Sequence, residues 1–227
     1  MKPIFIFLTF LISIIIASES AAQENEPRYF SINYIQRLHF VNYQNFTNIQ
    51  GAALPKLKDN SRFHGMRLEG EIANNILVGL YANGSLDDSK NANGYTSMGG
   101  GIGVATIEYR YQLPVNFFTS LGFGLGCGRF TYSSALKNGN KSVISNVDAI
   151  FGEPNIKIGY ILKKKLILIF DASYMFVISS NKYNAGANNI PDVFPRGWFI
   201  GGSIGFQLSF INTKKKEKSK TTSAHLK

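Results

Sequence analysis

The chain has 227 residues and a single cysteine, Cys127, which excludes an intramolecular disulfide framework and leaves room for one domain. Its formal net charge is +10 at neutral pH, but six lysines lie in the last 17 residues, a pattern typical of a solvated tail. The chain carries no stacking or groove-reading motif, so nucleic-acid binding is not expected.

The first 22 residues have the features of a secretory signal peptide. Lys2 precedes an apolar run over residues 4–17, and Ser20 and Ala22 occupy the small-residue positions of a cleavage site. The run of about 14 residues is short for a membrane-spanning helix, which needs roughly 20. We therefore expect export and cleavage after Ala22, with an uncleaved anchor as the alternative.

Alternating apolar and polar residues predict three strands in the first part of the mature chain. The first lies near residues 29–40 and the second near residues 62–73. Asn74 and Asn75 form a two-residue turn, since asparagine tolerates a positive φ. The third strand follows near residues 76–84, where both faces carry apolar residues.

The fourth strand is expected near residues 95–113, and its two halves differ. In the first half Ile102 and Val104 share a face opposite glycines. In the second half the same parity carries charged residues such as Glu108, and the apolar residues lie on the other face. This change of phase predicts a β-bulge near Ala105.

The fifth strand carries a glycine at every second position. In a strand these glycines lie on one face and the large residues between them on the other. The glycines are Gly122, Gly124, Gly126 and Gly128, and the residues of the other face are Leu121, Phe123, Leu125 and Cys127.

Three further strands are expected near residues 150–162, 166–179 and 196–210. The connections after the second, fourth and sixth strands are short, whereas those after the first, third, fifth and seventh are long and polar. The long ones are expected over residues 41–61, 85–94, 134–149 and 180–195. Eight antiparallel strands with all short turns at one end predict an up-and-down transmembrane β-barrel.

An eight-stranded barrel has an interior just wide enough for side chains, so large inward residues require small residues opposite them. A three-residue turn over residues 114–116 places Glu108 opposite Gly122, and the turn over residues 163–165 places Lys157 opposite Asp171. We expect a neutralised charge network that closes the lumen; a thin water channel is the alternative. The predicted network consists of Arg37, Arg67, Glu69, Glu71, Glu108, Arg110, Lys157 and Asp171.

The strand pattern, the unequal connections and the final "GFQLSF" resemble small eight-stranded outer-membrane proteins of the OmpA/OmpX type, within the bacterial outer membrane protein β-barrel domain group. The resemblance covers roughly residues 29–210. It implies a location in the outer membrane, contact with its lipid, and a signal for the barrel-assembly machinery at Phe206, Leu208 and Phe210. The expected organisation is a signal peptide over residues 1–22, the barrel over residues 23–210 and a basic, disordered periplasmic tail over residues 211–227.

Two other classes of protein are weighed against a non-enzymatic membrane barrel. A lipid-modifying enzyme acting on lipopolysaccharide would need a nucleophile and a base near the rim, where His39 and His64 lie on adjacent strands. A secreted lipocalin-like barrel would hold a ligand in an apolar interior and turn polar residues outward. No metal or cofactor motif is present: the three histidines lack metal spacing, and neither glycine run has the spacing of a phosphate-binding loop.

The expected function is therefore envelope structure or surface interaction. A surface ligand would contact the long connections, because loops on a rigid scaffold are where binding residues concentrate. The segment over residues 188–198 combines aromatic residues with two prolines.

Overall fold

The computed structural model describes residues 28–40, 55, 57, 60–137, 142–163, 165–185 and 194–210. The expected signal peptide over residues 1–22 and the expected tail over residues 211–227 lie outside the described residues. Within the described ranges, no helix has the length and hydropathy that crossing a membrane requires.

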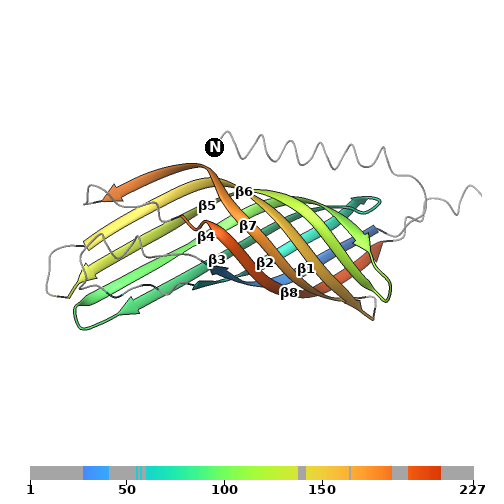
Figure 1. The fold of residues 1–227 in the computed structure, drawn as a ribbon, viewed down its shortest axis with the longest axis horizontal. Coiled ribbons are helices and arrows are strands. Elements are labelled where there is room, and N and C mark those ends of the chain that lie inside the picture. The colour runs from blue at the N-terminus through green and yellow to red at the C-terminus, as the bar shows by residue number, and fades with distance from the viewer. Residues whose placement is uncertain are drawn as a thin grey trace, which may run out of the picture.

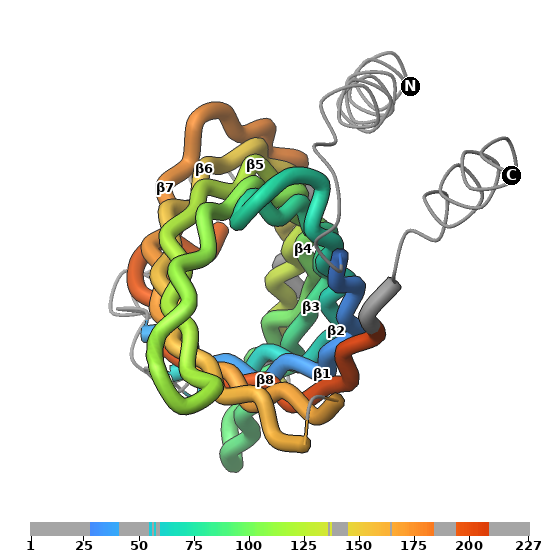
Figure 2. The backbone as a smooth tube through the Cα atoms, turned by 90° about the vertical axis from the view of Figure 1, so that its right-hand side faces the viewer, coloured from blue at the N-terminus to red at the C-terminus, as the bar shows by residue number. Residues whose placement is uncertain are grey.

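Eight antiparallel strands form one closed barrel in chain order, with β8 paired to β1 (Figures 1 and 2). The strands are β1 (Arg28–Phe40), β2 (Asn60–Ala73), β3 (Ile76–Lys90), β4 (Gly94–Gln112), β5 (Phe117–Leu136), β6 (Ser142–Leu162), β7 (Leu166–Ala185) and β8 (Gly197–Phe210). The up-and-down β-barrel predicted from the sequence is confirmed.

The turns at one end of the barrel, called here the short-turn end, set the register of the strands. Asn75 has a positive φ of 66° between β2 and β3, as the asparagine dipeptide predicted. Between β4 and β5, Leu113 donates its backbone N–H to the carbonyl of Phe117 at 2.8 Å. The predicted pairs therefore form: Glu108 lies opposite Gly122, and Lys157 lies opposite Asp171.

The opposite end, called here the long-connection end, differs from the expectation. Strands continue into the expected long connections, and the longest extensions are those by which β3 reaches Lys90, β5 reaches Leu136, β6 begins at Ser142 and β7 reaches Ala185. Only residues 91–93 then separate β3 from β4. These extensions carry polar residues on both faces, and a strand that leaves the bilayer needs no apolar face. Figure 1 shows β3 to β7 extending beyond β1, β2 and β8.

The β-bulge expected near Ala105 is wrong. β4 pairs with both neighbours without a shift of register, and the shifts that occur lie between Glu71 and Ala73 and between Ile150 and Phe151. Ile102 faces inward with the parity of Glu108. The strand is therefore uninterrupted. The apparent change of phase arises because the inward residues of β4 are polar at the short-turn end and apolar toward the long-connection end.

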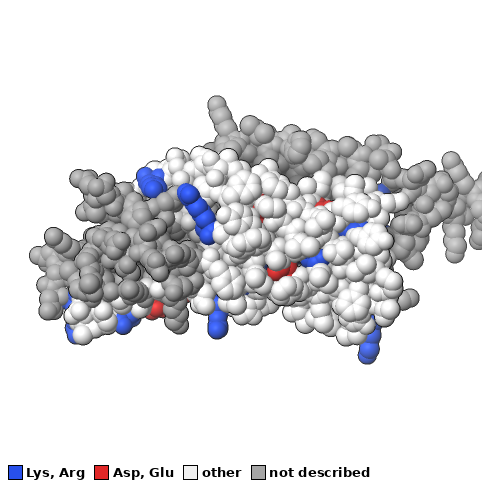
Figure 3. Space-filling view, in the orientation of Figure 1, with Lys and Arg blue, Asp and Glu red and all other residues white. Residues whose placement is uncertain are grey.

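The outer face of the barrel is apolar around its middle. Leu121 is 62% exposed and Phe170 is 58% exposed, whereas charged residues such as Arg37 and Lys157 are 1% exposed and lie inside. Uncharged residues cover most of the described surface in Figure 3. This arrangement is the reverse of the lipocalin alternative and suits a barrel surrounded by lipid.

An exposed ion pair marks where the apolar band ends on β5 and β6. Beyond Leu125 and Cys127, the next outward residue of β5 is Arg129, which contacts both carboxylate oxygens of Asp148 at 2.5 and 2.6 Å. The hydrogen bond from Arg129 holds the pKa of Asp148 below its ordinary value. The membrane-spanning part of these strands therefore lies on the short-turn side of this pair.

Candidate functional site

The lumen contains the candidate site, and its side chains lie in three successive layers. A small apolar cluster lies at the short-turn end, a set of charges lies above it, and a larger apolar cluster fills the long-connection end. The name charge layer is used below for the buried ionic residues of the middle layer: Arg37, Arg67, Arg110, Lys157, Glu69, Glu108, Glu153 and Asp171.

Arg37 on β1 connects three other strands within the charge layer. Its guanidinium contacts Glu153 of β6 at 2.9 Å and pairs with Asp171 of β7. It also donates a hydrogen bond of 3.1 Å to the hydroxyl of Tyr81 on β3, and that hydroxyl donates to Glu153. One cation thus binds strands that are distant in the sequence, and the planar guanidinium suits several acceptors at once.

Lys157 forms the second centre of the charge layer. Its ammonium group pairs with Glu69 of β2 and lies 2.6 Å from Glu108 of β4. Arg67 lies between the two centres, 3.6 Å from Glu69 and 3.6 Å from Asp171. The two centres are therefore joined into one network of buried, charge-assisted contacts.

The structure places the predicted residues differently in three respects. Arg110 is buried but stacks on the ring of Phe118, with its guanidinium carbon 4.3 Å from the ring centroid. Glu71 lies apart from the charge layer, and its carboxylate accepts the backbone N–H of Asn75 at 3.0 Å, where it stabilises the turn. Glu153 was missed, although it has the inward parity of Lys157.

Glu153 and Glu71 exchange roles with respect to the prediction, and the charge balance is kept. The charge layer holds four cations and four anions, the same numbers as were predicted. The signal for Glu153 was its spacing of four residues from Lys157, but Gly152 and Pro154 on either side are typical of turns rather than strands.

Glycines on neighbouring strands give the charges their room. Gly201 of β8 lies between Arg37 of β1 and Asp171 of β7, and a Cβ atom on Gly201 would lie 2.6 Å from the Cγ atom of Arg37. A Cβ atom on Gly122 would lie 2.4 Å from the Cγ atom of Glu108. The ionic contacts therefore cross over strands that present bare backbone to the lumen.

The upper apolar cluster closes the lumen at the long-connection end. Residues of the long connections take part in it: Phe194 packs on Phe130 and Phe151, with ring centroids 5.4 and 5.7 Å apart, and Leu57 is 7% exposed. The cluster comprises Ile35, Leu57, Phe63, Tyr81, Met98, Ile102, Val104, Phe130, Tyr132, Val147, Ala149, Phe151, Met175, Phe194 and Phe199. Strand alternation does not predict that an aromatic residue of a connection lies inside the barrel.

The lower apolar cluster lies at the short-turn end and consists of Phe118, Ile167 and Ile169, with Ile161 packed against it. Because Arg110 stacks on Phe118, this cluster is in direct contact with the charge layer. Buried charges thus have apolar side chains both above and below them.

The two histidines considered for catalysis do not share a site. His39 faces inward and stacks on Phe199 at 4.1 Å, whereas His64 faces outward and is hydrogen-bonded to Tyr34 at 2.8 Å. His225 lies outside the described residues. Cys127 is exposed on the outer face, and no group of three or more potential metal-binding side chains occurs among the described residues.

The residues of the expected assembly signal lie on β8. Phe206 and Leu208 are exposed on the outer face, at 66% and 51%. Phe210 ends the strand, where its backbone is paired with Arg28 of β1. Two outward apolar residues thus precede the end of β8, at the seam where β8 pairs with β1.

No protein-family model and no curated protein sequence matches this chain. Its fold is similar to that of the N-terminal β-barrel domain of OprF from Pseudomonas aeruginosa, with 9% identity, a TM-score of 0.49, and coverage of 82% of this chain and 100% of that chain. Ail, the attachment invasion locus protein of Yersinia pestis, is similar over 82% of this chain and 100% of its own, with 13% identity and a TM-score of 0.45. The outer membrane protease OmpT from Escherichia coli is similar over 83% and 99%, with 7% identity and a TM-score of 0.42.

Proposed function

We propose that this chain is a non-enzymatic protein of the bacterial outer membrane, exported by residues 1–22, whose barrel does not conduct ions freely. It acts in envelope structure or surface interaction through the strand extensions and connections at the long-connection end. The observation that carries the proposal is the filled lumen, in which a neutral charge layer lies between two apolar clusters.

The burial of the charge layer supports a closed lumen. Arg37, Arg67 and Lys157 are each 1% exposed, and Phe63, Phe130 and Phe151 above them are not exposed at all. A charge that lined a water channel would remain exposed to solvent. A charge that is buried needs compensation, because an uncompensated buried ion is strongly disfavoured. Ion pairs within the layer supply that compensation.

The long-connection end supports a role at the surface. β3 and β4 remain paired as far as Lys90 and Tyr95, well beyond the last pair of β2 with β3 at His64 and Gly84. Charged residues such as Asp88 are exposed on this extension. A rigid polar sheet outside the bilayer provides a surface on which a ligand or a neighbouring cell-surface component can bind.

Reconstitution into a planar bilayer tests the closed lumen. The unmodified barrel should show no steady current. A double variant that removes one side chain from each of two layers, Arg37→Ala with Phe151→Ala, should conduct, because both barriers to water are weakened. The matched control is Arg37→Ala with Phe123→Ala. It should conduct less than the double variant, because Phe123 lies on the outer face and the upper apolar cluster stays intact. Steady open-channel currents from the unmodified barrel would refute the proposal.

The absence of enzymatic activity is tested separately. The purified barrel is incubated with lipopolysaccharide, and released or transferred acyl chains are sought by mass spectrometry. No turnover is expected, since His39 and His64 lie on opposite faces of the wall. Release of acyl chains that scales with protein concentration would make the lipid-modifying enzyme the better description.

A further inference from the structure

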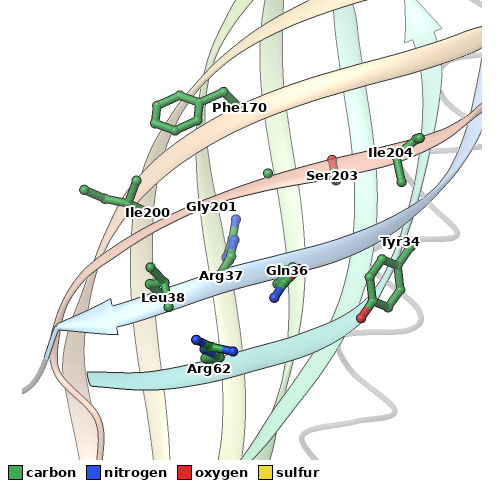
Figure 4. A pocket seen from close by; sticks show the side chains of 11 residues that line it. Tyr34, Gln36, Arg37, Leu38, Arg62, Phe170, Ile200, Gly201, Ser203 and Ile204 are labelled. Atoms are coloured by element: carbon green, nitrogen blue, oxygen red, sulfur yellow. The ribbon is translucent and has the colours of Figure 1, made fainter. Parts of the chain in front are cut away.

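A hollow on the outer face of the barrel lies where β8 meets β1, outside the filled lumen. It has a volume of about 650 Å³ and is open to the lipid side (Figure 4). Gly202 forms its floor, and a Cβ atom there would meet only the backbone oxygen of Ile169, at 3.2 Å. Leu38, Ile200 and Phe170 form apolar walls. The absence of a side chain on one outward residue thus leaves a groove in the lipid-facing surface.

Polar side chains converge on this hollow from β1 and β2. Gln36 and Arg62 line it, and His64 lies directly opposite Gln36 in the register of the two strands. Among the described residues, Arg62 makes no ion pair and Gln36 no side-chain hydrogen bond. Polar and ionisable side chains are rare on a lipid-facing surface because lipid chains offer them no partner. Their grouping around a hollow indicates a partner with a polar group.

The level of Arg62 in the membrane fits a lipid headgroup. Counted from the short turns, Arg62 lies eleven residues from Ala73, and Arg129, which marks the end of the apolar band, lies twelve residues from Phe117. Arg62 is therefore close to the polar boundary of the bilayer at the long-connection end. From it the hollow extends over Gly202 toward Phe170, in the apolar band.

We propose that this hollow binds an anionic, phosphate-bearing lipid of the surrounding leaflet. The guanidinium of Arg62 holds the phosphate, Gln36 donates its amide N–H to a polar group of the lipid, and one acyl chain lies over Gly202 between Leu38 and Ile200. A guanidinium suits phosphate oxygens, and the groove removes part of the chain from contact with mobile lipid. The proposal requires insertion in a bilayer but does not depend on a closed lumen. The conductance test of the closed lumen and the test of lipid binding can therefore fail independently of each other.

Native mass spectrometry of the detergent-solubilised barrel tests this site, with phosphatidylglycerol as the probe. Diacylglycerol with the same acyl chains lacks the phosphate and measures binding by the chains alone. Inorganic phosphate lacks the acyl chains and measures binding by the phosphate alone. The unmodified barrel should retain one phosphatidylglycerol in preference to diacylglycerol. Arg62→Met should weaken retention about tenfold, in line with the loss of a charged hydrogen bond.

Two further variants separate the groove from general surface charge. Gly202→Leu fills the floor and should lower retention while the barrel still folds, as judged by heat-modifiable gel mobility. Arg129→Met removes an exposed arginine at a similar level and should leave retention unchanged. Equal retention by Arg62→Met and the unmodified barrel would overturn the proposal, as would an equal loss in Arg129→Met. Displacement of bound phosphatidylglycerol by inorganic phosphate alone would also overturn the proposal, as would a stable dimer of the barrel that covers the hollow.

Discussion

At the scale of single residues, the lumen is built on pairs of a large side chain and a glycine on an adjacent strand. Gly201 lies beside Arg37, Gly126 lies under the ring of Phe151, and a Cβ atom on Gly159 would lie 2.1 Å from the ring of Phe118. Each glycine lowers the strand's own stability somewhat, since it packs nothing. In return, an interior of limited width accommodates ionic and aromatic side chains without overpacking.

The role of the lumen glycines predicts a difference between two alanine substitutions. Gly201→Ala places a Cβ atom 2.3 Å from the backbone oxygen of Gln36, so it should lower the free energy of unfolding by about 1 to 3 kcal/mol. Gly103→Ala lies on the outer face, where a Cβ atom would meet nothing within 4 Å. It should leave stability unchanged or raise it by about 0.5 kcal/mol. Urea unfolding in micelles measures both, and an equal effect would contradict the packing argument.

The assignment of inner and outer faces predicts a second difference. Leu121→Arg places a charge on the outer face in the middle of the apolar band, at a cost of about 2 to 4 kcal/mol. Gln207→Arg places the same charge in the polar lumen, because Gln207 is 4% exposed and faces inward. The fraction of protein that folds into lipid vesicles should therefore fall more for Leu121→Arg. The reverse order would mean that the faces have been exchanged.

At the scale of strands, the alternation in the sequence was sufficient where a short turn fixed the register. The pairs formed by Glu108 with Gly122 and by Lys157 with Asp171 followed from counting back from turns of three residues. Where strands leave the bilayer, alternation no longer distinguishes strand from loop, because the outer face there also carries polar residues such as Asp148. The extension of β7 as far as Ala185 was therefore not foreseen.

The same reasoning explains the two errors within the lumen. The inward residues of β4 change from polar to apolar along the lumen. In the sequence this change has the same pattern as a switch of the apolar face, which is why a β-bulge was predicted near Ala105. Pro154 lacks a backbone N–H, and the described pairs of β6 with β7 skip Glu153 and Pro154. Because of this local irregularity, the strand pattern did not predict that Glu153 belongs to the charge layer. Side chains on strands that are not neighbours come into contact only when the sheet closes into a barrel. The pairing of neighbouring strands, which the sequence predicts, does not specify these contacts.

The connection of β1 to β6 and β7 through Arg37 predicts a large effect of one substitution. Arg37→Met leaves Glu153 and Asp171 buried without their principal cation, so it should lower the free energy of unfolding by about 3 to 5 kcal/mol. Arg129→Met removes the same side chain from the exposed pair with Asp148, which contributes little to stability. Denaturant midpoints in one micelle system compare the two variants. Equal midpoints would show that the charge layer contributes no more than a surface pair.

At the scale of the whole molecule, the barrel reverses the arrangement of a soluble protein on its outside and partly restores it on the inside. Apolar residues such as Leu121 cover the wall, and the lumen holds both an ionic layer and a packed aromatic cluster. The sequence predicted the wall, because strand alternation reports directly on which face is apolar. It predicted a network of charges in the lumen but not the apolar clusters on either side of it, since Phe194 enters the lumen from a connection whose path no periodic pattern describes.

The pairing of Arg37 with Asp171 bears on the order of events in folding. β1 and β7 are joined only through β8, so these two side chains come together when the first and last strands meet and the sheet becomes a cylinder. An open sheet already inserted in the bilayer would expose the same charges to hydrocarbon, where each is strongly disfavoured. Seam closure and burial of the charges are thus one cooperative step, and the intermediate that precedes it is best stabilised while the future lumen still faces water.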